Sequence, residues 1–207
     1  MKFTRRFAIG ITTAVALLAL QGTAQAEVEK VTIAVGGKSL FYYLPLTIAE
    51  QRGYFKEEGV NVEIVDFAGG SKALQAVVGG SADVVSGAYE HTIKLQGKKQ
   101  YFTAFVQQAR APQIVLAVST KTMPNYKTIA DLKGKKIGVT APGSSTNMVA
   151  SFVLDGAGVS SKEVSFIGVG AGSGAVAAMK TGQIDAIANL DPVISSLERD
   201  GALKVLV

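Results

Sequence analysis

Short runs of β-branched residues alternate along the chain with longer segments whose apolar positions recur every three or four residues. The first pattern is typical of buried strands and the second of amphipathic helices. We predict strands at 31–35, 62–67, 84–86, 102–107, 114–118, 136–139, 164–169, 186–188 and 203–207. We predict helices at 45–52, 71–78, 147–154 and 175–180. This alternation indicates an α/β fold built on mainly parallel sheets.

The pattern of strands and helices occurs twice. An offset of 102 residues places the segment 62–83 on 164–185, with matching Gly, Ser, Ala and Asp positions, and an offset of 106 places Val31 on Ile137. Other α/β chains show coincidences of this kind, so a single domain stays open as an alternative. We favour two similar lobes whose junction lies within residues 108–135, where prolines interrupt the pattern.

Residues 1–26 have the three-part pattern of a secretory signal peptide. A basic stretch with adjacent arginines precedes an apolar run over 7–20, and Ala-Gln-Ala at 24–26 provides a cleavage site. The apolar run is shorter than the roughly 20 residues that a membrane span needs. We therefore predict a mature protein that begins near Glu27 and is periplasmic. The adjacent arginines leave open the choice between the general and the twin-arginine export routes.

Composition removes several classes of function. The chain has no Cys and a single His, which excludes disulfides, thiolate nucleophiles and multi-His metal sites. Lys and Arg number 21 against 16 Asp and Glu, but three of the basic residues lie in the leader, so the mature chain is nearly balanced. We expect no nucleic-acid partner and a monomer. The Gly-rich segment 141–145 lacks the Gly-Lys-Ser/Thr ending of a phosphate-binding loop, and we expect no cofactor.

The loops that follow the predicted strands carry the candidate ligand-binding residues. In open parallel sheets, ligands bind beyond the carboxyl ends of the strands, where helix N-termini present backbone N–H groups. Taken singly, each loop is explained better by a turn with a helix cap than by a ligand contact. Their recurrence at equivalent positions favours a shared cleft. The candidates are Ser39, Phe41, Tyr42, Gly70, Ser71, Tyr89, Glu90, His91, Arg110, Gly143, Ser144, Ser145, Thr146 and Asp191.

These loops offer both signs of charge. Lys38 and Arg110 favour an anion, because a guanidinium fork matches a carboxylate or a sulfonate. Glu90 and Asp191 instead suit an amine or an aminopyrimidine. The ligand therefore stays open between these chemical classes.

Hydrolysis is the main catalytic alternative. Ser144 or Ser145 would need a general base, and His91 is the only imidazole in the chain. The Gly-x-Ser-x-Gly pattern of a nucleophile elbow is absent from the sequence. We therefore expect a protein that binds its ligand without converting it.

Five segments together carry a family resemblance. They are Gly-Tyr-Phe-Lys-Glu-Glu-Gly-Val-Asn-Val-Glu at 53–63, the segment 69–87, Asp-Leu-Lys-Gly-Lys-Lys-Ile-Gly-Val at 131–139, Gly-Ser-Ser at 143–145 and Thr-Gly-Gln-Ile-Asp-Ala at 181–186. In this order and spacing they resemble the periplasmic substrate-binding proteins of ABC importers, of the nitrate, sulfonate and taurine type. That group also includes binders of thiamine-pyrimidine precursors.

The resemblance implies two α/β lobes of the type II periplasmic-binding-protein fold that close around one small molecule and deliver it to a membrane permease. On this basis we assign residues 27–110 to the first lobe, 111–130 to the crossover and 131–207 to the second lobe. In the family the second lobe continues and returns to the first, so we expect it to be incomplete here. Two alternatives share the fold. One is a synthase-like enzyme, which would carry a Cys-rich motif, and the other is a ligand-sensing regulatory module.

Overall fold

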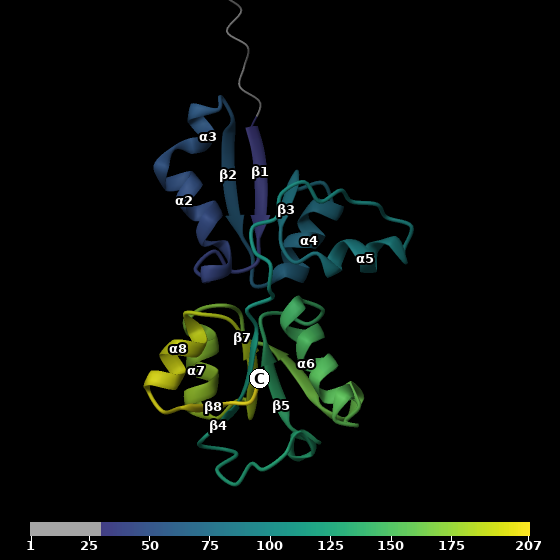
Figure 1. The fold of residues 1–207 in the computed structure, drawn as a ribbon, viewed down its shortest axis with the longest axis vertical. Helices are drawn as coiled ribbons and strands as arrows, with labels where there is room; N and C mark the ends of the chain where they lie inside the picture. The colour runs from purple at the N-terminus through teal and green to yellow at the C-terminus, as the bar shows by residue number, and fades with distance from the viewer. Residues whose placement is uncertain (1–29) are drawn as a thin grey trace, which may run out of the picture.

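Residues 30–207 form two lobes, stacked along the long axis of this part of the chain (Figure 1). The computed structural model describes residues 30–207, and the predicted signal peptide lies outside this range. In each lobe a central sheet has helices on either side (Figure 1). Of the helices within 30–207, none is both long enough and apolar enough to cross a membrane.

The first lobe contains a three-stranded parallel sheet in the order β2-β1-β3. Its elements are β1 (Lys30–Val35), η1 (Phe41–Tyr43), α2 (Leu44–Arg52), α3 (Tyr54–Glu57), β2 (Asn61–Asp66), α4 (Gly70–Val78), β3 (Val84–Ser86) and α5 (Glu90–Gln96). Pro at the start of α2 fits the first turn, where its missing N–H costs nothing. Gly53 ends α2 in the left-handed conformation, at a φ of 78°, which glycine adopts without steric strain.

The second lobe contains a five-stranded sheet in the order β6-β5-β7-β4-β8. Its elements are β4 (Val115–Ser119), η2 (Ile129–Leu132), β5 (Lys136–Val139), α6 (Ser145–Gly156), η3 (Ser161–Glu163), β6 (Ser165–Gly168), α7 (Ser173–Thr181), β7 (Ala186–Asn189), α8 (Val193–Arg199) and β8 (Leu203–Val205). Strand β5 pairs parallel with β6 and β7, whereas β4 runs antiparallel to β7 and β8. The sheets are therefore mainly parallel, as the sequence predicts.

The two sheets repeat one another, which confirms the internal repeat. The order β2-β1-β3 in the first lobe corresponds to β6-β5-β7 in the second. The carboxylate of Asp83 accepts a hydrogen bond from the backbone N–H of Thr32 at 2.8 Å, and that of Asp185 accepts one from Lys136 at 3.0 Å. Two Asp residues matched by the offset of 102 thus hold the start of the central strand in the same way in both lobes.

The offset of 106 for the first strand of each repeat is wrong by two residues. Ile33 pairs with Val84 and Ile137 pairs with Ala186, so Ile33 and Ile137 are the equivalent positions and their offset is 104. Side chains alternate between the two faces of a strand, so a shift by two residues leaves the apolar pattern unchanged. The hydrophobic pattern alone was therefore unable to distinguish the two alignments.

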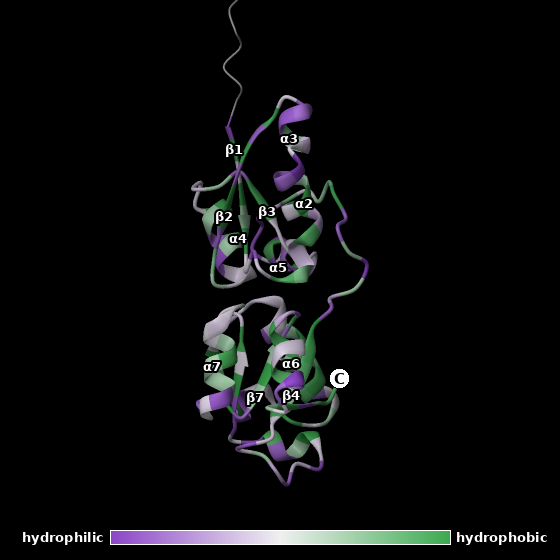
Figure 2. Ribbon diagram, turned by 90° about the vertical axis from the view of Figure 1, so that its left-hand side faces the viewer, coloured by the Kyte–Doolittle hydropathy of each residue, from purple (hydrophilic) through white to green (hydrophobic). Residues whose placement is uncertain are grey.

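The predicted strand at 102–107 is also wrong. This segment forms no helix or strand, and Phe105 and Val106 are 74% and 65% exposed. It belongs to an irregular connection that runs along one side of the molecule to the second lobe (Figure 2). In the described part of the chain this segment pairs with no strand, and the first sheet ends at β3. Apolar and β-branched residues favour a strand only where a partner strand and a buried face are present.

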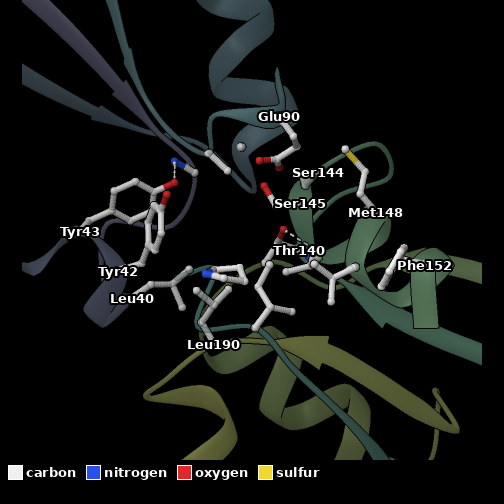
Figure 3. Close-up of a pocket in the computed structure, with 17 residues that line it drawn as sticks. Leu40, Tyr42, Tyr43, Glu90, Thr140, Ser144, Ser145, Met148, Phe152 and Leu190 are labelled. Atoms are coloured by element: carbon white, nitrogen blue, oxygen red, sulfur yellow. Dashed lines mark hydrogen bonds between the residues drawn. The ribbon is translucent and has the colours of Figure 1, made fainter. Parts of the chain in front are cut away.

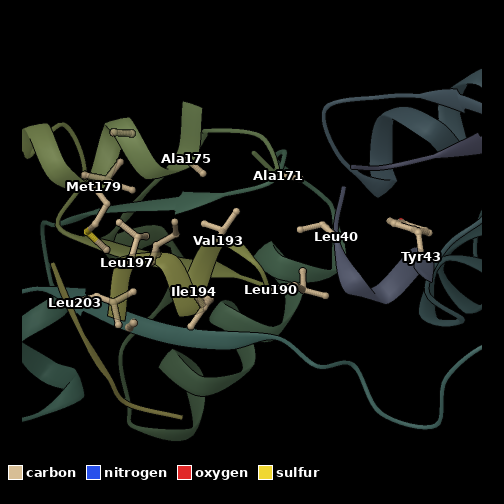
Figure 4. Close-up of a cluster of buried hydrophobic side chains, with 14 of the residues drawn as sticks. Leu40, Tyr43, Ala171, Ala175, Met179, Leu190, Val193, Ile194, Leu197 and Leu203 are labelled. Carbon is tan, nitrogen blue, oxygen red and sulfur yellow. The ribbon is translucent and has the colours of Figure 1, made fainter. Parts of the chain in front are cut away.

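The apolar core has three parts: one bridges the lobes, one belongs to the second lobe, and a small one in the first lobe packs α4 against β1 through Ala34, Ala73 and Ala76. The bridging cluster extends from β1 through Leu40 and Tyr43 to Leu190 and the helices α7 and α8 (Figure 4). The second-lobe cluster packs α6 and η2 against β5 and includes the fully buried Leu132 and Leu154. The shared core means that the two lobes are in direct contact.

Strand β4 lies within residues 111–130, which the sequence assigned to the crossover. Its hydrogen bonds go to β7 and β8, so these residues complete the sheet of the second lobe. The irregular connection from about residue 100 to Ile114 links the lobes instead.

Candidate functional site

The first contact between the lobes is made by the segment that follows β1. The backbone N–H of Phe41 donates to the carbonyl of Asp191 at 2.9 Å, and the hydroxyl of Ser39 donates to the carbonyl of Ala171 at 3.3 Å. A Cβ on Gly37 would lie 2.3 Å from the Cβ of Ala171, and its φ of +106° already favours glycine. The close approach of the lobes therefore depends on a glycine here.

The second contact joins the loop after β2 to the loop after β5. The hydroxyl of Ser144 accepts a hydrogen bond from the backbone N–H of Ser71 at 3.0 Å and donates to the Ser71 hydroxyl at 3.0 Å. The Ser71 hydroxyl in turn donates to the carbonyl of Pro142 at 3.0 Å. These three bonds tie the N-terminus of α4 to that of α6. The hydrogen-bonding groups of both serines are therefore used within the protein.

A cavity of about 320 Å³ lies between the lobes (Figure 3). It is lined by the first lobe, the connection and the second lobe, namely by Gly36, Leu40, Tyr42, Tyr43, Gly70, Ala88, Glu90, Pro112, Ile114, Thr140, Ser144, Ser145, Thr146, Met148, Val149, Phe152 and Leu190. Its volume and its mainly apolar wall are typical of sites for small organic ligands.

Few polar groups face this cavity. In Figure 3 the carboxylate of Glu90 and the hydroxyl of Ser145 point into the same space. The hydroxyl of Tyr43 accepts a hydrogen bond from the backbone N–H of Gly36 at 3.3 Å. Thr146 is buried and its hydroxyl accepts from the backbone N–H of Thr140 at 3.0 Å. The Glu90 carboxylate, the Ser145 hydroxyl and the Tyr42 hydroxyl are therefore polar groups that line the cavity without a recorded partner there.

Burial perturbs several titratable groups near the cavity. Desolvation raises the pKa of Tyr42, and the charge of Glu90 adds to the effect. Desolvation also raises the pKa of Tyr43 far above its usual range. Burial lowers the pKa of His91, against the opposing effect of Glu90 and with a smaller lowering contribution from Lys94. Both tyrosines are therefore neutral phenols, and His91 is neutral at physiological pH.

The structure brings six of the fourteen predicted ligand-binding residues to this cavity: Tyr42, Gly70, Glu90, Ser144, Ser145 and Thr146. A further three, Ser71, His91 and Gly143, line a second cavity of about 210 Å³ beside the Ser71–Pro142 contact. The other five, Ser39, Phe41, Tyr89, Arg110 and Asp191, line neither cavity. Arg110 is exposed on the connection, and the carboxylate of Asp191 accepts from the backbone N–H of Ser195 at 2.9 Å in the first turn of α8. Lys38 pairs with Glu50 at 2.7 Å.

One wall of the cavity was not predicted. Helix α6 presents Ser145, Met148, Val149 and Phe152 to it. This spacing of three, four and seven residues marks one helix face. On the other side of the helix, Leu154 packs in the core of the second lobe, whereas Val149 lines the cavity. The helix is apolar on two faces, and the sequence alone did not indicate which of them meets a ligand.

Metal-ligating side chains do not gather anywhere in residues 30–207, since no group of three or more His, Asp or Glu residues is placed to hold an ion.

Comparison with known proteins gives a family match over residues 40–202, to the NMT1/THI5-like model. The putative binding protein YtlA from Bacillus subtilis is 30% identical over 142 residues, which is 67% of this chain and 42% of that protein. The 4-amino-5-hydroxymethyl-2-methylpyrimidine phosphate synthase of Schizosaccharomyces pombe is 26% identical over 111 residues, 53% of this chain and 31% of the enzyme. The chain thus spans less than half the length of these relatives.

Solved structures show the same fold. A protein from Bordetella bronchiseptica RB50 is 66% identical, with a TM-score of 0.85 over 86% of this chain and 56% of that one. The alkanesulfonate-binding protein SsuA from Xanthomonas axonopodis pv. citri, solved with MOPS, is 24% identical, with a TM-score of 0.64 over 86% of this chain and 60% of that one. The fold is therefore that of the periplasmic binding proteins. Since the family model covers most of the sequence, the chain belongs to the NMT1/THI5-like family.

Proposed function

We propose that this protein is the solute-binding component of an ABC importer, which binds a small organic molecule between its lobes outside the cytoplasm and delivers it to a membrane permease. The observation that carries the proposal is the interlobe cavity, whose wall is shared by both lobes and by the connection between them. A ligand in this position contacts both lobes at once, so its binding free energy favours the closed arrangement. The names of the binding proteins among the relatives and solved structures support this role.

The lining of the cavity favours an organic molecule over a small free anion. Of the residues that line it, none is Lys, Arg or His, and Arg110 and Lys38 lie elsewhere. In this cavity an anion would find no cationic side chain to replace its hydration and would depend on backbone N–H groups at the starts of α4 and α6. Apolar side chains such as Leu40, Met148 and Leu190 instead suit a hydrocarbon or ring.

Binding without conversion fits the chemistry of the site better than catalysis does. Nucleophilic catalysis needs a base within hydrogen-bonding reach of the attacking group. Ser144 bonds Ser71, and His91 lines the second cavity rather than the first. The enzymatic relatives are the reason to keep a synthase-like activity as the second candidate.

Calorimetric titration of the exported protein tests the proposal. The probes are alkanesulfonates, nitrate, carboxylates and aminopyrimidines. We expect one class to bind at a single site per chain, to raise the melting temperature and to be recovered chemically unchanged.

Two variants test whether that ligand binds in the interlobe cavity. Phe152→Ala should weaken its binding roughly two- to tenfold through the loss of an aromatic contact. Tyr54→Ala removes an exposed aromatic on α3 and should not change it. A ligand unaffected by Phe152→Ala would place binding elsewhere, and accumulation of a product would establish the enzyme instead.

A further inference from the structure

Two residues other than glycine adopt the left-handed backbone conformation within residues 30–207. They are Lys99, at a φ of 60°, and Gln113, at a φ of 55°. Residues with a Cβ are disfavoured in this conformation and keep it only where the surrounding structure requires it. Both residues lie at the ends of the irregular connection between the lobes (Figure 2). The strained positions of the described chain thus bracket the segment that links the lobes.

Lys99 has a local explanation. Helix α5 ends at Gln96, and beyond it the backbone N–H of Gln100 donates to the carbonyl of Leu95 at 3.0 Å. A left-handed residue just after the last turn is a common way to satisfy the free carbonyls at the end of a helix. The conformation of Lys99 therefore belongs to the end of α5.

Gln113 has no such explanation. It follows no helix, and β4 begins two residues later at Val115. Its side chain is exposed, so packing of that side chain does not impose the conformation. Its two neighbours, Pro112 and Ile114, both line the interlobe cavity. The left-handed turn therefore stands beside the proposed binding site.

The connection is anchored to a different lobe on each side of this turn. The side-chain amide of Gln108 donates to the hydroxyl of Ser86, the last residue of β3, at 3.0 Å. Ile114 is partly buried and packs against both the bridging cluster and the second-lobe cluster. A motion of one lobe relative to the other is therefore taken up within residues 109–113.

Few backbone angles within 109–113 are free to turn. The ring of Pro112 fixes its φ, and Ala111, as the residue before a proline, is held in extended conformations. Gln113 directly follows this stiff pair and precedes the anchor at Ile114. A change at Gln113 from the left-handed to the extended region would redirect the chain where it enters β4. A hinge is a small number of residues that absorb such a change in φ and ψ.

We propose that Gln113 determines the affinity of the interlobe site without contacting the ligand. Its backbone is left-handed when the lobes are closed and relaxes to the extended region when they open. The cost of the left-handed conformation then opposes closure, and so reduces the affinity for any molecule held between the lobes. This inference rests on the proposed function and concerns the control of the same site.

A series of substitutions at Gln113 tests the proposal, because an exposed side chain can be exchanged without disturbing the core. Glycine adopts the left-handed conformation freely, asparagine adopts it more readily than glutamine, and valine least readily. The ratio of closed to open protein should therefore fall in the order Gly, Asn, Gln, Val. We expect a roughly three- to tenfold higher ratio for Gln113→Gly and a comparable loss for Gln113→Val.

The ratio can be measured without a ligand. Spin labels on Lys56→Cys and Lys162→Cys, both exposed and one on each lobe, report the interlobe distance in the full exported protein by pulsed electron paramagnetic resonance. The population of short distances should follow the order of the series. Calorimetric titration with methanesulfonate, nitrate, benzoate and 4-aminopyrimidine then shows whether the dissociation constant of a bound probe follows the same order.

Lys99→Gly is the matched control. It relieves the same backbone conformation at the end of α5, within the first lobe, so it should leave the interlobe distances and the dissociation constants unchanged.

The outcomes distinguish this inference from the function on which it rests. Equal distances in all the Gln113 variants, or a shift of the same size in Lys99→Gly, would overturn the role of Gln113. A dissociation constant that stays constant while the distances change would overturn its link to affinity. Distances that follow the expected order while no probe binds would support the hinge and count against the proposed function.

Discussion

Replacing Gly69 by Ala tests whether the lobes are held closed by close backbone packing. Gly69 precedes α4 in the first lobe, and its φ of −178° is extended backbone that alanine also adopts. A Cβ there would lie 2.9 Å from the hydroxyl oxygen of Thr140, 3.0 Å from the Cβ of Ala141 and 3.0 Å from the Ala141 nitrogen. All three atoms belong to the second lobe. The substitution therefore strains the contact between the lobes while leaving the first lobe intact.

The size of the effect follows from these distances. Carbon atoms in contact ordinarily sit about 3.5–4.0 Å apart, so the new methyl group overlaps its neighbours by several tenths of an ångström or more. Overpacking of this kind costs about 1–3 kcal/mol. Opening of the lobes relieves it completely. We therefore expect the ratio of closed to open protein to fall by about 5- to 150-fold, and the affinity for an interlobe ligand to fall with it.

The absence of cysteine makes the motion straightforward to measure. Spin labels on Lys56→Cys in α3 and Lys162→Cys in η3, both exposed, place one label on each lobe. Pulsed electron paramagnetic resonance should then show longer distances in Gly69→Ala than in the parent protein. Calorimetry with a ligand measures the loss of affinity in parallel.

Gly172→Ala is the matched control. Gly172 stands before α7 as Gly69 does before α4, but a Cβ on Gly172 meets no atom within 4 Å. It should leave the distances and the affinity unchanged. Equal effects of the two substitutions would assign the change to the helix cap, and no effect of Gly69→Ala would refute the idea that this contact restrains the lobes.

Three further predictions concern stability. Leu132→Ala, in the fully buried core of the second lobe, should lower the free energy of unfolding by about 2–5 kcal/mol in urea titrations, whereas exposed Val207→Ala should change it little. Asp83→Ala and Asp185→Ala should each lower the free energy of unfolding by about 0.5–1.5 kcal/mol, because each removes the same hydrogen bond to a strand N–H. Strongly unequal losses would contradict the equivalence of the repeats. Burial lowers the pKa of His91, so the unfolded chain binds a proton more readily than the folded one, and the free energy of unfolding should fall as the pH drops below about 6.5. His91→Gln should flatten this part of the pH profile of stability. An unchanged profile would show that another group is responsible.

The sequence predicted most of the elements and their repetition, but not the helices α3, α5 and α8. The remaining predicted strands and the four predicted helices have counterparts in the structure within a few residues, because the period of two or of three to four residues follows from backbone geometry. The predicted strand at 102–107 was wrong because that prediction rested on local sequence pattern alone. Strand propensity is a property of the segment itself, whereas a strand also needs backbone pairing with a partner, and within residues 30–207 this segment pairs with none.

Only the tertiary structure decided which predicted residues meet a ligand. The sequence selected Glu90 and Ser145, which face the cavity, together with Ser144, whose hydrogen bonds are used on Ser71 across the lobes. It placed Arg110 in the same group, although that side chain is exposed on the connection. These four residues lie in loops or at the first positions of helices, and the local sequences around them are similarly polar. Their roles differ because long-range packing of one lobe on the other, which no local pattern encodes, fixes which hydroxyls are paired and which side chains line the cavity.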